Sequence, residues 1–334
     1  MTPHLLELEV EIEDVALERL SVEIGEWTRA TTIVHLRGRG VEGVGEDVTY
    51  QAELHEHFPE PAVAGRWTLA SFSDQLEPLD LFPKTPPRDE AARDYRRWAW
   101  ESAALDLALT QAGLTLADAV GRQPQPVRYV VSTRAQNVRP LLDRYPDLRF
   151  KLDPAREWLD GLLDELASVG RVDTADYKGV YRGDFGFEPN PELYVRVAEA
   201  FPNAWLEDPG LNDETDRALE PYRDRITWDA PIHSWQDVER LPFPPRCLNV
   251  KPSRFATVGR LFEFYEECAR REIGLYGGGQ FELGVGRRQI QELASLFHPD
   301  GPNDVAPGVF NVAAVPDDAP PSPLDPPRVF GTKS

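Results

Sequence analysis

Hydrophobic and polar residues alternate with two different periods along the chain, and the change of period divides it into two parts. Residues 31–53 alternate apolar and polar positions on both sides of a glycine-rich turn, which predicts an antiparallel hairpin. Residues 54–88 are rich in proline and predict a loop. In ARDYRRWAWESAALDLALTQAG, which ends at Gly113, apolar residues recur with helical spacing. The first part is therefore predicted to be an α+β unit.

Beyond GRQPQP at 121–126, short apolar runs rich in β-branched residues alternate with helical stretches such as PAREWLDGLLDELASVG and NPELYVRVAEAF. The strand candidates recur roughly every 20 to 30 residues, as in a (β/α) barrel. They are residues 127–134, 148–153, 172–179, 204–209, 225–231, 247–253 and 272–279. A doubly wound open sheet is the alternative, but no G-x-G-x-x-G follows the first candidate strand. We therefore predict an α/β fold with a barrel.

The predicted domains follow from these patterns. They are an α+β capping domain over residues 1–125, a (β/α) barrel catalytic domain over 126–314 and a proline-rich tail over 315–334. The composition VPDDAPPSPLDPPRVFGTKS predicts that the tail extends along the surface or is disordered rather than packing.

Composition excludes several classes of partner. The net charge of -21 repels phosphate backbones and anionic membranes alike, so we expect neither nucleic acid nor lipid as a partner. Cys247 and Cys268 lack metal-ligand spacing and are too few for a disulfide framework, which indicates a reducing compartment. No apolar run approaches the roughly 20 residues of a membrane span, and the N-terminus is acidic. We expect a cytoplasmic protein.

Three consecutive strand candidates end in a carboxylate. Asp176 closes VDTAD, Glu207 closes AWLE and Asp229 closes ITWD. The C-terminal ends of parallel strands lie about 4.8 Å apart, so these acids would not all stay ionised without a cation. Mg²⁺ prefers such oxygen ligands and keeps positions open for substrate, and we expect it as the cofactor. Asp208 is expected to lie beside the ligand set.

Lysines end the strands on both sides of these carboxylates: Lys151 in RFKLD and Lys251 in LNVKPS. Burial beside a metal cation lowers the pKa of an amine, which makes it a usable general base. We expect Lys151 and Lys251 to be an acid/base pair on opposite faces of one substrate. His55 and His57 have no third ligand in view, so we interpret them as residues of a solvated loop.

The order of these motifs resembles the enolase superfamily, and within it the muconate-lactonizing subgroup with o-succinylbenzoate synthases and dipeptide epimerases. The resemblance covers most of the chain and includes VKPSRFATVGRL and GGGQFELGVGR. It implies a modified TIM-type (β/α)7β barrel with a capping domain, with Asp176, Glu207 and Asp229 as Mg²⁺ ligands. It also implies removal of a proton α to a carboxylate through an enediolate.

The sequence departs from the subgroup's pattern at several points. The usual K-x-K is Arg149-Phe150-Lys151, the usual D-x-N is Asp176-Tyr177-Lys178, and the usual D-E is Asp229-Ala230. The Asp-x-Asp of dipeptide epimerases is replaced by Gln280 and Glu282. Arg149, Lys178, Gln280 and Glu282 are therefore candidates for substrate binding or for tuning the site. GGGQFELGVGR would either hold a substrate carboxylate at a helix N-terminus or form a tight turn.

The expected reaction is racemisation or epimerisation, or β-elimination, in the manner of o-succinylbenzoate synthases or acyl amino acid racemases. The enzyme would be an isomerase or a carbon-oxygen lyase. Its expected partner is a small-molecule carboxylate substrate, and self-association into a homo-oligomer is left open. Two alternatives remain: a metal-free lyase or aldolase barrel in which a lysine forms a Schiff base, and a barrel that binds ligands without catalysis.

Overall fold

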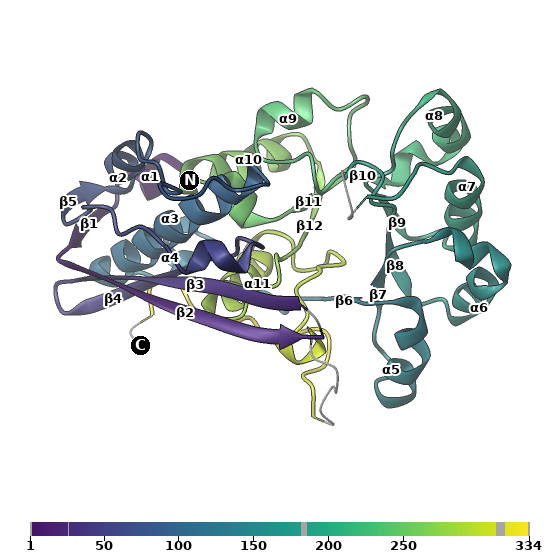
Figure 1. The fold of residues 1–334 in the computed structure, drawn as a ribbon, viewed down its shortest axis with the longest axis horizontal. Helices are drawn as coiled ribbons and strands as arrows, with labels where there is room; N and C mark the ends of the chain where they lie inside the picture. Colours follow the sequence, from purple (N-terminus) through teal and green to yellow (C-terminus); the bar gives the residue numbers. More distant parts are fainter. Residues whose placement is uncertain (1, 26, 182–185, 312–317, 333–334) are drawn as a thin grey trace.

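The structure is a computed structural model that describes residues 2–25, 27–181, 186–311 and 318–332. An N-terminal α+β cap lies beside a parallel α/β barrel, with the cap strands at one end of the molecule and the helices α5 to α8 at the other (Figure 1). The fold class predicted from the sequence is confirmed. The domain boundaries at residues 125 and 314 remain our proposal.

The main cap sheet contains the predicted hairpin. It has three antiparallel strands in the order β2 (Asp14–Ile24), β3 (Trp27–Gly38) and β4 (Val41–Asp47). The turn is formed by Arg39 and Gly40, both with positive φ (52° and 73°), which suits the twist of a two-residue hairpin. Strand β2 was not predicted; its side chains are all partly or fully exposed, and only Val15 and Leu17 of the strand pack against the core.

The rest of the cap packs around this sheet. It comprises a two-stranded sheet of β1 (Glu9–Ile12) and β5 (Gly65–Thr68), the helices α1 (Thr2–Leu6), α2 (Leu69–Leu76) and α4 (Leu116–Val120), and the 3-10 helix η1 (Ala52–His55). His55 is buried, with Nδ1 2.8 Å from Thr32 Oγ1 and Nε2 2.9 Å from the Thr49 carbonyl. The solvated-loop interpretation of His55 is therefore wrong.

Helix α3 (Ala91–Ala112) is the predicted long helix, and it ends at Gly113 in the left-handed conformation with φ 67°. Strand β4 lies directly on it. A Cβ at Gly43 would lie 2.2 Å from the Leu107 amide nitrogen, and one at Gly45 would lie 2.1 Å from the Ala99 carbonyl oxygen. These two glycines point to the same face of the strand, so the backbone of β4 contacts the helix with no side chain between them.

The barrel strands coincide with all seven candidates. They are β6 (Val131–Ser132), β7 (Phe150–Leu152), β8 (Val172–Asp176), β9 (Trp205–Glu207), β10 (Ile226–Thr227), β11 (Cys247–Val250) and β12 (Gly274–Gly277). Strands β6 to β10 form one parallel sheet in chain order, and β11 pairs with β12.

Backbone hydrogen bonds close the barrel between these sheets. They run from Asn249 N to Trp228 O (3.1 Å), from Asp304 N to Gly277 O (2.7 Å) and from Val130 N to Asn303 O (2.8 Å). Residues 303–304 thus take the place of an eighth strand between β12 and the segment leading into β6. The (β/α)7β barrel implied by the resemblance includes an eighth strand, but its position was not predicted, because only two residues pair and they are polar.

Helices follow most of the strands and pack outside the barrel. They are α5 (Val138–Arg144), α6 (Leu162–Val169), α7 (Pro191–Ala200), α8 (Asp213–Leu219), α9 (Trp235–Glu239), α10 (Val258–Arg270) and α11 (Val285–Phe297), with 3-10 helices η2 (Ala135–Asn137), η3 (Arg156–Asp160), η5 (Glu220–Arg225), η6 (Pro252–Phe255) and η7 (Gly308–Asn311). Gly161, with φ 109°, separates η3 from α6, which the sequence predicted as one helix. Among the described residues, none of the helices has the length and apolar composition needed to cross a bilayer.

The described part of the proline-rich segment, residues 318–332, contacts the cap at its end. Glu292 of α11 accepts the backbone N–H groups of Val329 and Phe330, each at 2.8 Å. Asp106 of α3 accepts the N–H of Gly331 at 2.8 Å, and Phe330 is fully buried. The segment follows the surface as expected, but residues 329–331 pack, contrary to the prediction. Residues 315–317 and 333–334 of the predicted tail lie outside the described residues.

Candidate active site

The barrel brings the strand-end carboxylates together. Asp176 and Glu207 end β8 and β9, pair in register and are buried. Asp208 follows at once with φ 49°, a left-handed conformation that is uncommon for a residue other than glycine. Both of its carboxylate oxygens accept backbone N–H groups, from Asp229 and Ala230, each at 2.9 Å. This fixes the carboxylate of Asp208 next to the strand ends.

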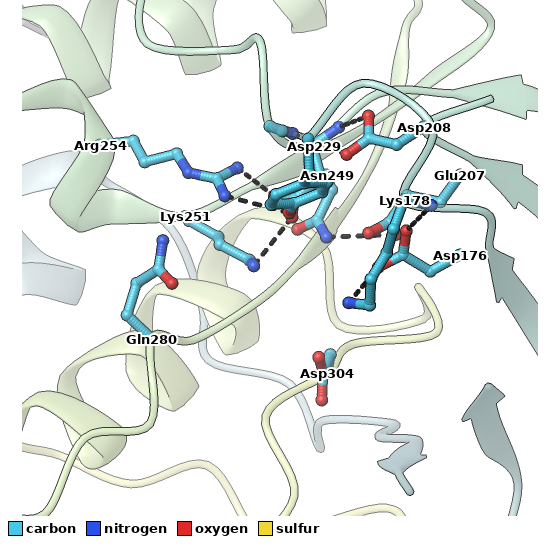
Figure 2. A network of polar contacts seen from close by, with 12 residues as sticks. Asp176, Lys178, Glu207, Asp208, Asp229, Asn249, Lys251, Arg254, Gln280 and Asp304 are labelled. Atoms are coloured by element: carbon cyan, nitrogen blue, oxygen red, sulfur yellow. Dashed lines mark hydrogen bonds and ion pairs between the residues drawn. The ribbon is translucent and has the colours of Figure 1, made fainter. Parts of the chain in front are cut away.

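The tightest acidic group differs from the predicted triad in one member. Carboxylate oxygens of Asp176, Glu207 and Asp208 all lie within 4.8 Å of one another. Asp229 lies two residues beyond β10, and its carboxylate is bound instead by Lys251 (2.8 Å) and Arg254. Figure 2 shows this division, with Asp229 between the acidic group on one side and Lys251 and Arg254 on the other.

The two predicted catalytic lysines lie on opposite sides of the carboxylates. Lys151 of β7 is 3% exposed and contacts Glu207 and Asp176, the latter at 3.3 Å. Lys251 follows β11, is 8% exposed and binds Asp229. The stem of Lys251 lies against Gly278, where a Cβ would come within 2.8 Å of Lys251 Cε. The two lysines thus come from strands that flank those carrying the carboxylates, and their roles as an acid/base pair stay a prediction.

Charges and burial shift the pKa values of these groups in opposite directions. Burial raises the pKa of Glu207 to about 8, although Lys151 opposes the shift. Burial also raises the pKa of Asp208 to about 7, helped by Asp229. For Lys151, burial alone would lower the pKa, but Glu207 and Asp176 outweigh it and the pKa lies well above its usual range. For Asp229, Arg254 and Lys251 outweigh burial and hold the pKa below its usual range.

Lys178 and Arg149 occupy different environments. Lys178 lies within the acidic group, with Nζ 3.2 Å from Asp176 and 3.3 Å from Asp153. These carboxylates outweigh its burial, so the pKa of Lys178 lies above its usual value. Arg149 donates from Nε to Asp173 at 2.6 Å and pairs with the same carboxylate through Nη2. The structure therefore gives Arg149 an ion-pair partner on β8 rather than a place among the strand-end carboxylates.

Gln280 and Glu282 join the barrel to the cap. The side chain of Gln280 accepts from Tyr50 OH (3.0 Å) and donates to Tyr95 OH (3.1 Å). Tyr50 follows β4 and Tyr95 belongs to α3, so both hydroxyl groups come from the cap. Glu282 binds the backbone N–H of Gln280 and pairs with Arg287 of α11 at 3.0 Å.

The glycine-rich segment before α11 is occupied by a carboxylate of the protein itself. Glu46 of β4 is buried and accepts the N–H groups of Leu283, Gly284 and Gly286 at 2.8 to 3.1 Å. The N-terminus of a helix favours negative charge, and here the cap supplies it. In this structure these amides are therefore bound by Glu46 and are not free for a substrate carboxylate.

Several site residues were missed from the sequence. Arg254 of η6 is buried, binds Asp229 and lies 3.4 Å from Tyr181 OH. Its place in KPSR, three residues after Lys251, was the available signal, since one helical turn brings such residues together. Asn249 and Tyr276, from β11 and β12, both donate to Glu207. They alternate with apolar neighbours in their strands, and only the barrel shows that they face inward.

The side chains present suit a hard divalent cation. The acidic group of Asp176, Glu207 and Asp208 offers only carboxylate oxygens, the ligands that Mg²⁺ prefers. The amide oxygen of Asn249 is buried and has no hydrogen-bond partner among the described residues. Such a buried polar atom costs free energy unless a ligand or water satisfies it. The chemistry of the donor set therefore fits a magnesium ion beside Glu207.

Two matching family profiles cover nearly the whole chain. The first, "Domain of unknown function (DUF8230) C-terminal domain", matches residues 123–312. The second, the DUF8230 N-terminal domain, matches residues 3–119. The chain belongs to the DUF8230 family.

Curated relatives of this family member include two o-succinylbenzoate synthases. That of Geobacillus stearothermophilus is 24% identical over 289 residues, which cover 80% of this chain and 74% of the relative. That of Listeria innocua is 26% identical over 297 residues, with the same coverage. The resemblance to the enolase superfamily and to its muconate-lactonizing subgroup is confirmed.

Solved structures with the same fold cover most of the chain. A dipeptide epimerase from Methylococcus capsulatus, complexed with a Mg ion, is 18% identical, covers 91% of this chain and 92% of its own, and has a TM-score of 0.65. A muconate lactonizing enzyme is 16% identical, with 88% of each chain covered and a TM-score of 0.65. This DUF8230 protein therefore has the capping domain and barrel of the enolase superfamily.

Proposed function

We propose that this protein is a Mg²⁺-dependent enzyme that removes a proton α to the carboxylate of a small-molecule substrate. One observation carries the proposal: Lys151 and Lys251 are buried on either side of carboxylates that end successive barrel strands. A barrel places catalytic groups at the C-terminal ends of its strands. Two amines facing each other across one space can remove and return a proton on opposite faces of a substrate.

We further propose that Asp176 and Glu207 hold the ion, and that the third carboxylate is either Asp229, as the resemblance implies, or Asp208, as the shortest distances suggest. When bound, Mg²⁺ would draw these carboxylates to itself and supply positive charge beside the substrate carboxylate. Such charge stabilises the transition state in which negative charge develops on that group.

The lysines would then act as acid and base. In the structure Lys151 is bound to Glu207 and Asp176, which favour its protonated form. With these carboxylates engaged elsewhere, the pKa of Lys151 would fall, because burial opposes its charge. Lys251 is bound to Asp229, which Arg254 also neutralises. One lysine would take the α-proton, and the other would deliver a proton to the opposite face or to a leaving group.

Only the resemblance to known enzymes limits the choice of reaction and substrate. The o-succinylbenzoate synthases support β-elimination, and the dipeptide epimerase fold supports epimerisation or racemisation. We propose an isomerase or carbon-oxygen lyase of one of these kinds. Its cytoplasmic location and its self-association stay predictions.

The test is exchange of substrate α-protons for deuterium in D₂O, followed by NMR over a library of acyl amino acids, dipeptides and cyclic carboxylates. We expect exchange that requires Mg²⁺ and is lost in Lys151→Ala or Lys251→Ala. Lys84→Ala, which changes an exposed lysine of the cap, is the matched control and should keep full activity. Absence of exchange across the library in a protein that still binds Mg²⁺ would count against catalysis and favour a ligand-binding barrel.

A Schiff-base mechanism is separated by a second measurement. It needs a neutral lysine, whereas both lysines here are ion-paired with buried carboxylates. We therefore expect no trapping of aldehydes or ketones by borohydride at Lys151 or Lys251. A mass increase on either lysine after reduction would contradict the metal-dependent mechanism.

A further inference from the structure

Lys178 is held in the acidic group by an unusual backbone. Its φ is 49°, in the left-handed region that lysine rarely adopts. This turn directs two donors at one carboxylate: the backbone N–H reaches Asp176 Oδ1 at 3.0 Å, and the ammonium reaches Asp176 Oδ2 at 3.2 Å. Figure 2 shows the side chain folded back toward Asp176. A strained conformation that serves one ion pair indicates that this pair matters to the site.

The charges around Lys178 are not balanced. Among the residues that the structure describes, six carboxylates meet four cationic groups here: Asp153, Asp176, Glu207, Asp208, Asp229 and Asp304 against Lys151, Lys178, Lys251 and Arg254. Counted as formal charges, the carboxylates exceed the cationic groups by two, and burial relieves part of this excess by raising the pKa of Glu207 to about 8 and of Asp208 to about 7. Without Lys178 the excess would be three. The ammonium of Lys178 therefore offsets part of the repulsion that an empty cation site would suffer.

Lys178 has a second carboxylate within reach. Its ammonium already lies 3.3 Å from Asp153 Oδ2, which comes directly after β7. The other oxygen of Asp153 is buried and has no hydrogen-bond partner among the described residues. Lys178 can thus give up Asp176 and keep an ion pair with Asp153.

We propose that Lys178 is a built-in counter-cation of the metal site, which holds Asp176 until a divalent ion takes this carboxylate and then stays with Asp153. The inference rests on the proposed Mg²⁺ site and goes beyond it. It assigns Lys178 a role as a positioning residue that sets the affinity for the metal. The positive charge of Lys178 weakens metal binding, but it also stabilises the clustered carboxylates before the metal binds.

The test is calorimetric titration of the full chain with Mg²⁺ and Mn²⁺. Lys178→Met keeps the length of the side chain and removes its charge, and we expect it to lower the Kd by about tenfold or more, because a unit charge a few ångströms from the ion is removed. Lys178→Arg keeps the charge and should bind within about threefold of the unchanged protein. Lys178→Asn, a neutral residue that tolerates a left-handed backbone, should behave as Lys178→Met even if the latter folds poorly.

Thermal unfolding gives an independent readout. Without metal, Lys178→Met should unfold at a lower temperature than Lys178→Arg, because one negative charge is left unpaired. Saturating Mg²⁺ should then raise its midpoint by more than it raises that of the unchanged protein. A purely structural lysine would lower the midpoint equally with and without metal.

Each outcome of the metal titration supports or overturns the role of Lys178. Equal Kd values for Lys178→Met, Lys178→Asn and the unchanged protein would overturn the role of Lys178 and leave the metal site standing. Metal binding by Lys178→Met and Lys178→Asn, but not by the unchanged protein, would support the role of Lys178. Absence of metal binding in every variant would overturn both this inference and the metal part of the proposed function. Tighter binding without any proton exchange would support the inference and count only against the proposed reaction.

Discussion

At the residue scale, the position of the Lys251 side chain depends on Gly278 having no side chain of its own. It follows β12, and a Cβ there would lie 2.8 Å from Lys251 Cε and 3.0 Å from the amide oxygen of Asn249. Both are ends of side chains, so they would move while the backbone stays in place. Gly278 therefore determines where the amine of Lys251 lies and leaves the fold largely unaffected.

Gly278→Ala is expected to slow α-proton exchange by roughly 10- to 100-fold, because displacing a catalytic group by about 1 Å can cost this much. The unfolding midpoint should change little, because both displaced groups are ends of side chains. The measurement is the rate of exchange in D₂O with saturating substrate. Gly259→Ala in α10, where an added Cβ makes only ordinary contacts of 3.6 Å or more, is the control. An unchanged rate in Gly278→Ala would show that the position of Lys251 is not critical.

The sequence allowed part of the site to be predicted at this scale. Asp176 and Glu207 end their strands in register, and Lys151 pairs with Thr174, which lies two residues before Asp176 on the same face, so alternation along each strand predicts that the three converge. The sequence did not predict that Asp208 would join the acidic group and that Asp229 would pair with Lys251 and Arg254 instead. These two positions depend on φ 49° at Asp208 and on the buried Arg254, and neither is visible in a pattern of apolar and polar positions.

At the scale of elements, the contact between β4 and α3 depends on two glycines. Gly43→Ala is expected to lower the free energy of unfolding by roughly 2 kcal/mol or more, since its Cβ would meet rigid backbone atoms of Leu107 and Ala103 at 2.2 and 2.5 Å. Urea unfolding followed by fluorescence measures the change. In Gly308→Ala, where no atom lies within 4 Å of the added Cβ, stability should stay nearly constant. A neutral Gly43→Ala would mean that β4 can lift off the helix.

The elements themselves were predicted unevenly, for physical reasons. Most residues of the seven barrel strands are buried, and their short apolar runs alternate with helical stretches, which makes them easy to recognise. Strand β2 is largely exposed, and residues 303–304 pair through only two positions, so both are harder to recognise than a buried strand. Asx and Thr caps explain the well-predicted helix starts, as at Asn190 before α7. The break at Gly161 was missed because its flanks have high helical propensity.

At the scale of the whole molecule, residues 329–331 join cap and barrel through two buried carboxylates. Glu292 belongs to the barrel helix α11 and Asp106 to the cap helix α3. Burial raises the pKa of Glu292 to about 7, and Asp106 adds to this shift. Burial likewise raises the pKa of Asp106 to about 7. The folded protein therefore holds protons on these groups that the unfolded chain releases at lower pH.

The raised pKa of Glu292 determines how the stability of the protein changes with pH. Glu292 titrates near 4.5 when unfolded and about 7 when folded, so its contribution to stability is lost as the pH rises from about 4.5 to 7. Glu292→Gln keeps an oxygen for both N–H groups and cannot ionise. At pH 8 we expect the free energy of unfolding in urea to be roughly 1 to 3 kcal/mol higher for the variant than for the unchanged protein. Near pH 5 the two free energies should be equal.

The control for this prediction is Glu220→Gln, which replaces an exposed carboxyl group and should leave the pH dependence unaltered. A Glu292→Gln variant that is less stable than the unchanged protein at pH 8 would show that the ionised carboxylate strengthens the anchoring of residues 329–331. In that case the hydrogen bonds to Val329 and Phe330 would outweigh the cost of burying the charge.

The position of Glu46 at the start of α11 has a consequence for hydrogen exchange. Amides in the first turn of a helix have no partner within the helix and usually exchange rapidly with solvent. Here the amides of Leu283, Gly284 and Gly286 are bound by a carboxylate from more than 200 residues earlier in the chain. They are free to exchange when Glu46 moves away from them, as it does when the cap leaves the barrel. Their deuterium uptake would therefore give a lower limit for the free energy of detaching the cap, without any added label.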